Sequence, residues 1–88
     1  MEEVSIPILF FAKARELVGV GSSSISLSKS DRITGNQLRA VIVKTFPDLE
    51  NISENFVLAV NQQYIDPEQT IEVESTLEIA VIPPISGG

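Results

Sequence analysis

The sequence predicts an α+β fold in which a mixed sheet packs against one main helix. Segments rich in β-branched and aromatic residues, typical of strands, occur in both the N-terminal and the C-terminal parts of the chain. Between them, residues 35–45 show the apolar period of a helix. The length of 88 residues suits one domain with a modest core. Strands on both sides of a single main helix place that helix across one face of the sheet.

The N-terminal part of the chain predicts strand, short helix, strand. Residues 4–11 are apolar and β-branched or aromatic, as in a strand. Pro7 within them indicates an edge position or a bulge, because proline has no N–H to donate to a neighbouring strand. Residues 12–18 follow as a short helix, and Gly19 suits its C-terminal cap. Residues 24–28 alternate serine with apolar side chains, as in a strand with one buried face.

The main helix is predicted over residues 35–45. Thr34 suits its N-terminal cap, and Gln37 three residues later makes a capping box. Pro47 ends the helix, because a proline cannot continue it. The side chains expected on its apolar face are Leu38, Val41 and Ile42, with Thr45 or Phe46.

The C-terminal part predicts further strands and, with the rest, the β-grasp arrangement used by ubiquitin. A buried strand over residues 56–60 is followed by a turn at 61–63 and a short return strand at 64–65. Residues 70–73 are predicted to extend the sheet edge. A last strand over residues 76–82 carries apolar side chains on one face, at Leu77, Ile79 and Val81.

Composition excludes several classes of function. The chain has no cysteine and no histidine, which removes the thiol nucleophile, the usual general base and the commonest metal ligands. The net charge of −6 disfavours nucleic acid and favours a basic protein surface as partner. The acidic start is unlike a signal peptide, and no apolar run is long enough for a membrane span. We therefore expect a cytosolic protein with no metal site.

The end of the chain is the candidate working part. It has the sequence Pro83-Pro84-Ile85-Ser86-Gly87-Gly88. Prolines favour an extended conformation, so a tail over residues 83–88 reaches roughly 20 Å beyond a domain over residues 1–82. The glycines lack Cβ atoms, so the terminal carboxylate can enter a narrow cleft. The alternative interpretation is an ordinary frayed terminus.

Three segments resemble the small-subunit family of molybdopterin synthase, above all its eukaryotic form. They are residues 9–19 (LFFAKARELVG), residues 59–62 (AVNQ) and residues 78–88 (EIAVIPPISGG). The resemblance thus spans nearly the whole chain, and its Pro-Pro-x-x-Gly-Gly ending is highly specific. One departure lies before Glu78, where Ser75-Thr76-Leu77 stands in place of the Gly-Asp that family members often carry.

The resemblance implies a sulfur carrier that is not itself an enzyme. An E1-like adenylating sulfurtransferase would use ATP to adenylate the carboxylate of Gly88, and sulfur would replace the adenylate to give a thiocarboxylate. The tail, Pro83 to Gly87, would insert the charged end into the large catalytic subunit, in a heterotetramer of two small and two large subunits. There it would donate sulfur to cyclic pyranopterin monophosphate, building the dithiolene of molybdopterin. The carrier itself would hold no permanent cofactor.

The resemblance also places a partner interface at Phe11, Tyr64 and Ile82, although the alternation of side chains leaves a core position equally open for Phe11. Three other functions remain open. The chain could be a ubiquitin-like protein modifier conjugated through Gly88, or a sulfur carrier for thiamin synthesis or tRNA thiolation. It could also be an interaction domain with an inert tail.

Overall fold

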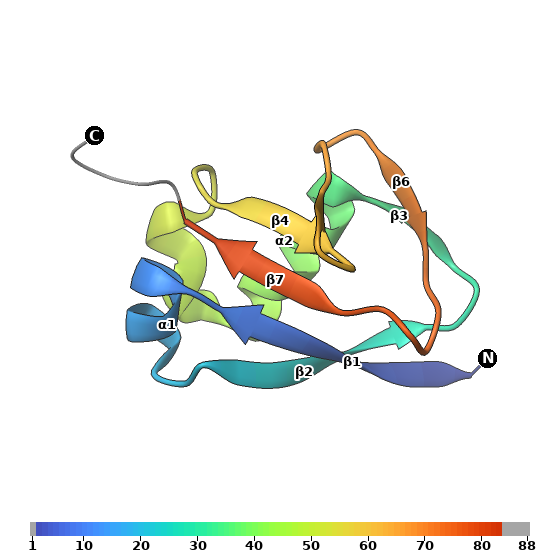
Figure 1. Ribbon diagram of the computed structural model, residues 1–88, viewed down its shortest axis with the longest axis horizontal. Coiled ribbons are helices and arrows are strands. Elements are labelled where there is room, and N and C mark those ends of the chain that lie inside the picture. Colours follow the sequence, from blue (N-terminus) through green and yellow to red (C-terminus); the bar gives the residue numbers. More distant parts are fainter. Residues whose placement is uncertain (1, 84–88) are drawn as a thin grey trace.

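The structure is a computed structural model that describes residues 2–83, and its main feature is a five-stranded mixed sheet (Figure 1). The strands are β1 (Glu3–Phe10), β2 (Ser22–Ser28), β4 (Val57–Val60), β5 (Gln63–Tyr64) and β7 (Ile79–Ile82). Their order is β2-β1-β7-β4-β5, with β1 and β7 parallel and the other neighbours antiparallel. The first and the last strand of the chain therefore lie side by side in the interior of the sheet.

Two α-helices form where the sequence predicts them. They are α1 (Ala12–Val18) and α2 (Gly35–Thr45). Gly19 ends α1 with a left-handed φ of 93°. The capping box of α2 is complete: the Gln37 N–H donates to the Thr34 hydroxyl (3.1 Å), and the Thr34 N–H donates to Oε1 of Gln37 (2.8 Å).

Beyond α2 the chain forms a 3₁₀ helix, η1 (Pro47–Ile52), which the sequence reading missed. Pro47 stands at its first position, where the missing N–H would have no intrahelical acceptor. The proline therefore ends the α-helix, as predicted, and also starts the next helical turn. Leu49 of η1 is fully buried, which ties this segment to the core.

A second, two-stranded sheet pairs β3 (Arg32–Thr34) with β6 (Thr70–Glu72). The prediction that residues 70–73 extend the main sheet is therefore wrong, and β3 was not predicted. This strand pair lies next to the start of α2, because β3 leads directly into the helix. Gly35 lies so close to the loop before β6 that a Cβ on it would come within 2.5 Å of the Asp66 carbonyl oxygen. Only glycine suits this position.

The prediction for Pro7 needs correction, because β1 lies inside the sheet between β2 and β7. The Phe11 N–H donates to the Val81 carbonyl of β7 (3.2 Å), so the odd-numbered residues of this strand direct their N–H side toward β7. Pro7 lies on that side, but the ladder with β7 begins only at Ile8. The missing N–H therefore removes no hydrogen bond of that ladder, and an interior strand tolerates the proline.

The core lies between one face of the main sheet and α2, which confirms the predicted arrangement of one main helix across the sheet. Phe10 stacks edge-on against Phe46, just beyond α2, with ring centroids 5.0 Å apart. Leu77 is buried as predicted, although β7 begins later than residue 76. The fully buried side chains of β1, β7 and α2 are Ile6, Ile8, Leu38, Ile42, Ile79 and Val81.

Candidate functional site

The sheet face opposite the core carries the candidate site, and the register of four strands builds it. Leu9 pairs with Ala80, Ala80 with Ala59, and Ala59 with Tyr64, so these residues form one row across the sheet. Paired residues of neighbouring strands place their side chains on the same face. The two alanines at the centre of the row are small, and larger side chains stand at both ends. The row therefore forms a depression.

This depression, the sheet-face hollow, has a volume of about 340 Å³. Its lining consists of Leu9, Phe11, Ala59, Gln62, Tyr64, Glu78, Ala80 and Ile82. All three residues of the predicted interface thus meet in one hollow, although they come from three separate parts of the chain. Their role in binding stays a prediction.

The exposure of these residues is unusual for large apolar side chains. Phe11 is 47% exposed and Tyr64 is 72% exposed, whereas Phe10 is 2% exposed. The sequence left either a core or a surface position open for Phe11. The structure places Phe11 at the surface and its neighbour Phe10 in the core. Ile82 is partly buried. Apolar surface gathered in a concavity is typical of a protein contact site.

The chain geometry around Phe11 explains its position. Phe11 is the N-cap residue of α1, and its carbonyl accepts a hydrogen bond from the Ala14 N–H (3.0 Å). Ala12 adopts a positive φ of 49°, which turns the chain from β1 directly into α1. The backbone of Phe11 is thus held between β7 and α1, beside the strand that leads to the tail. Figure 1 shows α1 at this end of the sheet.

The predicted tail begins at the same place. Ile82, the last residue of β7, lines the hollow, and Pro83 follows it directly. Pro83 is buried, so the first residue of the predicted tail packs against the domain. The remaining predicted site residues, Pro84 to Gly88, lie outside the described residues. The hollow therefore lies at the root of the segment that carries the terminal glycines.

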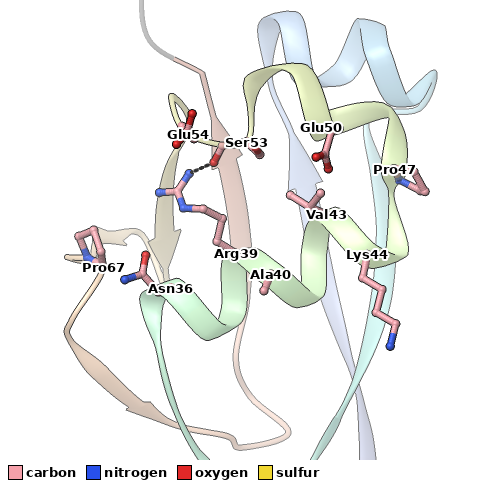
Figure 2. A pocket seen from close by; sticks show the side chains of 10 residues that line it. All are labelled: Asn36, Arg39, Ala40, Val43, Lys44, Pro47, Glu50, Ser53, Glu54 and Pro67. Carbon is pink, nitrogen blue, oxygen red and sulfur yellow. Dashed lines mark hydrogen bonds between the residues drawn. The ribbon is translucent and has the colours of Figure 1, made fainter.

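A larger hollow of about 730 Å³ lies on the other side of the domain, between α2 and η1 (Figure 2). We call it the helix-side hollow. Its lining includes Asn36, Arg39, Ala40, Val43, Lys44, Pro47, Glu50, Ser53, Glu54 and Pro67. No residue of the predicted site belongs to it.

Arg39 is the central group of the helix-side hollow, and its contacts lie within the chain. One guanidinium nitrogen donates to the Ser53 carbonyl oxygen at 2.7 Å, as Figure 2 shows. The guanidinium carbon lies 4.5 Å from the centroid of the Phe56 ring. Partial burial lowers the pKa of Arg39, because desolvation penalises the charged form. These contacts fasten the chain after η1 to α2, so Arg39 is a structural residue.

Metal binding and membrane insertion are two further possibilities for residues 2–83. No cluster of three or more acidic side chains within this range is arranged to bind a metal ion. No helix within it is long and apolar enough to cross a membrane.

Comparison with known proteins identifies the family. The sequence profile described as "ThiS family" matches residues 8–88, which is most of the chain. This chain belongs to the ThiS family. The chain is 39% identical over 85 residues to a Caenorhabditis briggsae protein, covering 97% of this chain and 99% of the relative. It is 41% identical over 81 residues to a Dictyostelium discoideum protein, covering 92% and 93%. Both relatives are named molybdopterin synthase sulfur carrier subunit.

Two solved structures share the fold of this chain. The small archaeal modifier protein 1 of Methanosarcina acetivorans superposes with a TM-score of 0.71 at 17% identity, over 100% of both chains. A Helicobacter pylori complex of subunits 1 and 2 of molybdopterin-converting factor contains a chain with a TM-score of 0.62 at 19% identity, covering 97% of this chain and 100% of that one. At these identities the likeness shows the fold alone, and it confirms the predicted ubiquitin-like β-grasp.

The sequence reading missed five residues of the hollow. Strand alternation places Glu78 and Ala80 on the same face as Ile82, so the sequence did carry a signal for these two residues. Leu9 and Ala59 join the hollow through strand pairing, and Gln62 joins it through the turn between β4 and β5. No local pattern encodes which strands are neighbours, so these three could not be assigned from the sequence.

Proposed function

We propose that this ThiS-family chain is the sulfur carrier subunit of molybdopterin synthase. The observation that carries the proposal is the combination of a Gly87-Gly88 end with near-full-length similarity, at 35–41% identity, to relatives that all bear this name. Their organisms range from a green alga and a slime mould to human. A role shared by relatives this distant from one another is the best-supported role for this chain.

The reactive group in this proposal is the carboxylate of Gly88. A carboxylate is a poor electrophile, so an E1-like enzyme first joins it to the AMP part of ATP, and pyrophosphate leaves. A sulfur nucleophile then attacks the carbonyl carbon of this mixed anhydride, AMP leaves, and a thiocarboxylate remains. These steps require no general base, thiol or metal from the carrier, in keeping with a chain that lacks histidine and cysteine.

The partner in this proposal is the large, catalytic subunit of molybdopterin synthase, in a cytosolic assembly of two small and two large subunits. The sheet-face hollow supports this partner, because it presents apolar side chains beside the root of the tail. The Helicobacter pylori complex of two subunits of molybdopterin-converting factor supports it as well, since one of its chains shares this fold. Docking there would hold the domain while the tail carries the thiocarboxylate to cyclic pyranopterin monophosphate. Each product needs two sulfur atoms, hence two charged carriers.

The test is an intact-mass measurement on the purified chain after incubation with ATP, the activating enzyme and a sulfur donor. A mass gain equal to one exchange of oxygen for sulfur, mapped to Gly88 and dependent on ATP, is the expected result. A matched chain without Gly87 and Gly88 should stay unchanged in mass and keep its melting temperature. An unchanged mass of the full chain beside an activating enzyme that charges its own carrier would overturn the proposal. Isopeptide conjugates through Gly88 in cell extract would point to a protein modifier instead.

A further inference from the structure

In the turn between β4 and β5, Gln62 occupies a position whose backbone conformation favours glycine. Val60 pairs with Gln63, so Asn61 and Gln62 form a two-residue hairpin loop, with φ values of 52° and 69°. Positive φ at both positions is the geometry of a type I′ turn, for which Asn-Gly is a preferred sequence. Asn61 suits the first position. Gln62 stands where glycine is favoured, so its backbone is strained.

The two amides of this turn serve different purposes. Oδ1 of Asn61 accepts a hydrogen bond from the Glu78 N–H (2.9 Å), and the Asn61 N–H donates to the Glu78 carbonyl (2.8 Å). These bonds fix the hairpin to the chain just before β7. The Gln62 amide makes no hydrogen bond to residues 2–83. The strain at Gln62 is thus not offset by a hydrogen bond of its own side chain within the described domain.

Gln62 lies on the sheet-face hollow, beside Tyr64 and Glu78. Of the eight lining residues, only Gln62 and Glu78 lack an apolar or aromatic side chain. A neutral amide in such a setting can both donate and accept hydrogen bonds. Positive φ also occurs outside the hollow, at Ser30, so the strain at Gln62 points to function only together with the position of its side chain on the hollow.

We propose that Gln62 is a specificity-determining residue of the sheet-face hollow, and that its amide binds a main-chain peptide group of the large subunit. This inference rests on the proposed function, which supplies the partner. A peptide group offers one N–H and one C=O, which match the acceptor and the donors of a glutamine amide. The neutral amide also loses less hydration free energy on burial than a charged side chain would.

The test compares two substitutions that relieve the same strain at different places. Gln62→Gly removes both the strain and the amide. Ser30→Gly is the matched control, because Ser30 is exposed, has a φ of 70° and lies outside the hollow. Both variants should raise the melting temperature by about 2–6 °C. Only Gln62→Gly should also weaken binding to the large subunit, by about 5- to 10-fold in titration calorimetry.

A third variant tests the chemistry of the bound group. Gln62→Glu keeps the size but replaces the donor by a negative charge, so a facing carbonyl would be repelled and binding should weaken more than in Gln62→Gly. Tighter binding of Gln62→Glu would show a cation opposite and overturn the assignment to a peptide group. Unchanged affinity of Gln62→Gly, or a lowered melting temperature, would overturn the inference while the wild-type chain still binds. Failure of the wild-type chain to bind the large subunit would instead overturn the proposed partner, and this inference with it.

Discussion

The helix-side hollow and the sheet-face hollow differ in what their side chains already contact. The helix-side hollow is the larger, yet its central side chain, Arg39, is engaged by the Ser53 carbonyl and the Phe56 ring. The sheet-face hollow is smaller, and its large side chains, Phe11 and Tyr64, stand exposed. Groups satisfied within the chain stabilise the fold, whereas apolar groups left exposed gain most from a partner. The exposure of large apolar side chains therefore indicates the candidate site better than the volume of a hollow does.

The largest expected difference between the two hollows is the effect of a substitution in the sheet-face hollow on binding to the large subunit. Tyr64→Ala should weaken binding to the large subunit by about 10- to 100-fold, because truncation of an aromatic anchor at an interface costs about 2 kcal/mol or more. Its stability should change by less than about 0.5 kcal/mol, since Tyr64 is 72% exposed. Titration calorimetry and thermal melting measure the two quantities on the same sample.

Val20→Ala is the matched control for Tyr64→Ala, because Val20 is 49% exposed but does not line either hollow. It should leave both affinity and melting temperature unchanged. Equal losses of affinity in the two variants would show that the sheet-face hollow has no special role. A loss confined to Tyr64→Ala would place the contact in that hollow.

The next largest effect is expected for Arg39→Ala, which should lower the stability of the fold and leave binding to the large subunit unchanged. Arg39→Ala removes a charged hydrogen bond at 2.7 Å and a cation–π contact, so the free energy of unfolding should fall by about 1.5–3 kcal/mol. Denaturant unfolding measures this change. Binding of the folded variant to the large subunit should be unaltered. A several-fold loss of affinity with intact stability would contradict the structural role of Arg39.

The smallest effect is expected at the capping box, which belongs to neither hollow. Thr34→Ala removes the acceptor of the Gln37 N–H at the start of α2, so unfolding should become easier by about 1 kcal/mol. The melting temperature should fall by about 4–8 °C for a domain of this size. This variant calibrates the comparison, because any loss of partner binding it shows reflects stability alone. If it weakens binding as much as Tyr64→Ala does, the assignment of Tyr64 fails.

Local chemistry let the sequence by itself determine much of this protein. The bounds of both α-helices followed from short-range signals: the apolar period, the Thr34–Gln37 box and the glycine at position 19. The buried face of β7 followed from alternation, which placed Ile79 and Val81 inward. The family followed from motifs that are continuous in sequence, at residues 9–19 and 78–88. All of these depend on residues a few positions apart.

Only the tertiary structure decided which segments became neighbours. Contacts between distant parts of the chain decided three features. They are the pairing of β3 with β6, the interior position of β1, and the placement of Phe10 in the core and Phe11 at the surface. The row of Leu9, Ala80, Ala59 and Tyr64 is the clearest case, since no one segment contains it. A hollow is a property of strand register, and register is set by global packing of the core face. The sequence could therefore indicate Phe11, Tyr64 and Ile82 by resemblance, but only the fold joined them with Gln62 in one surface.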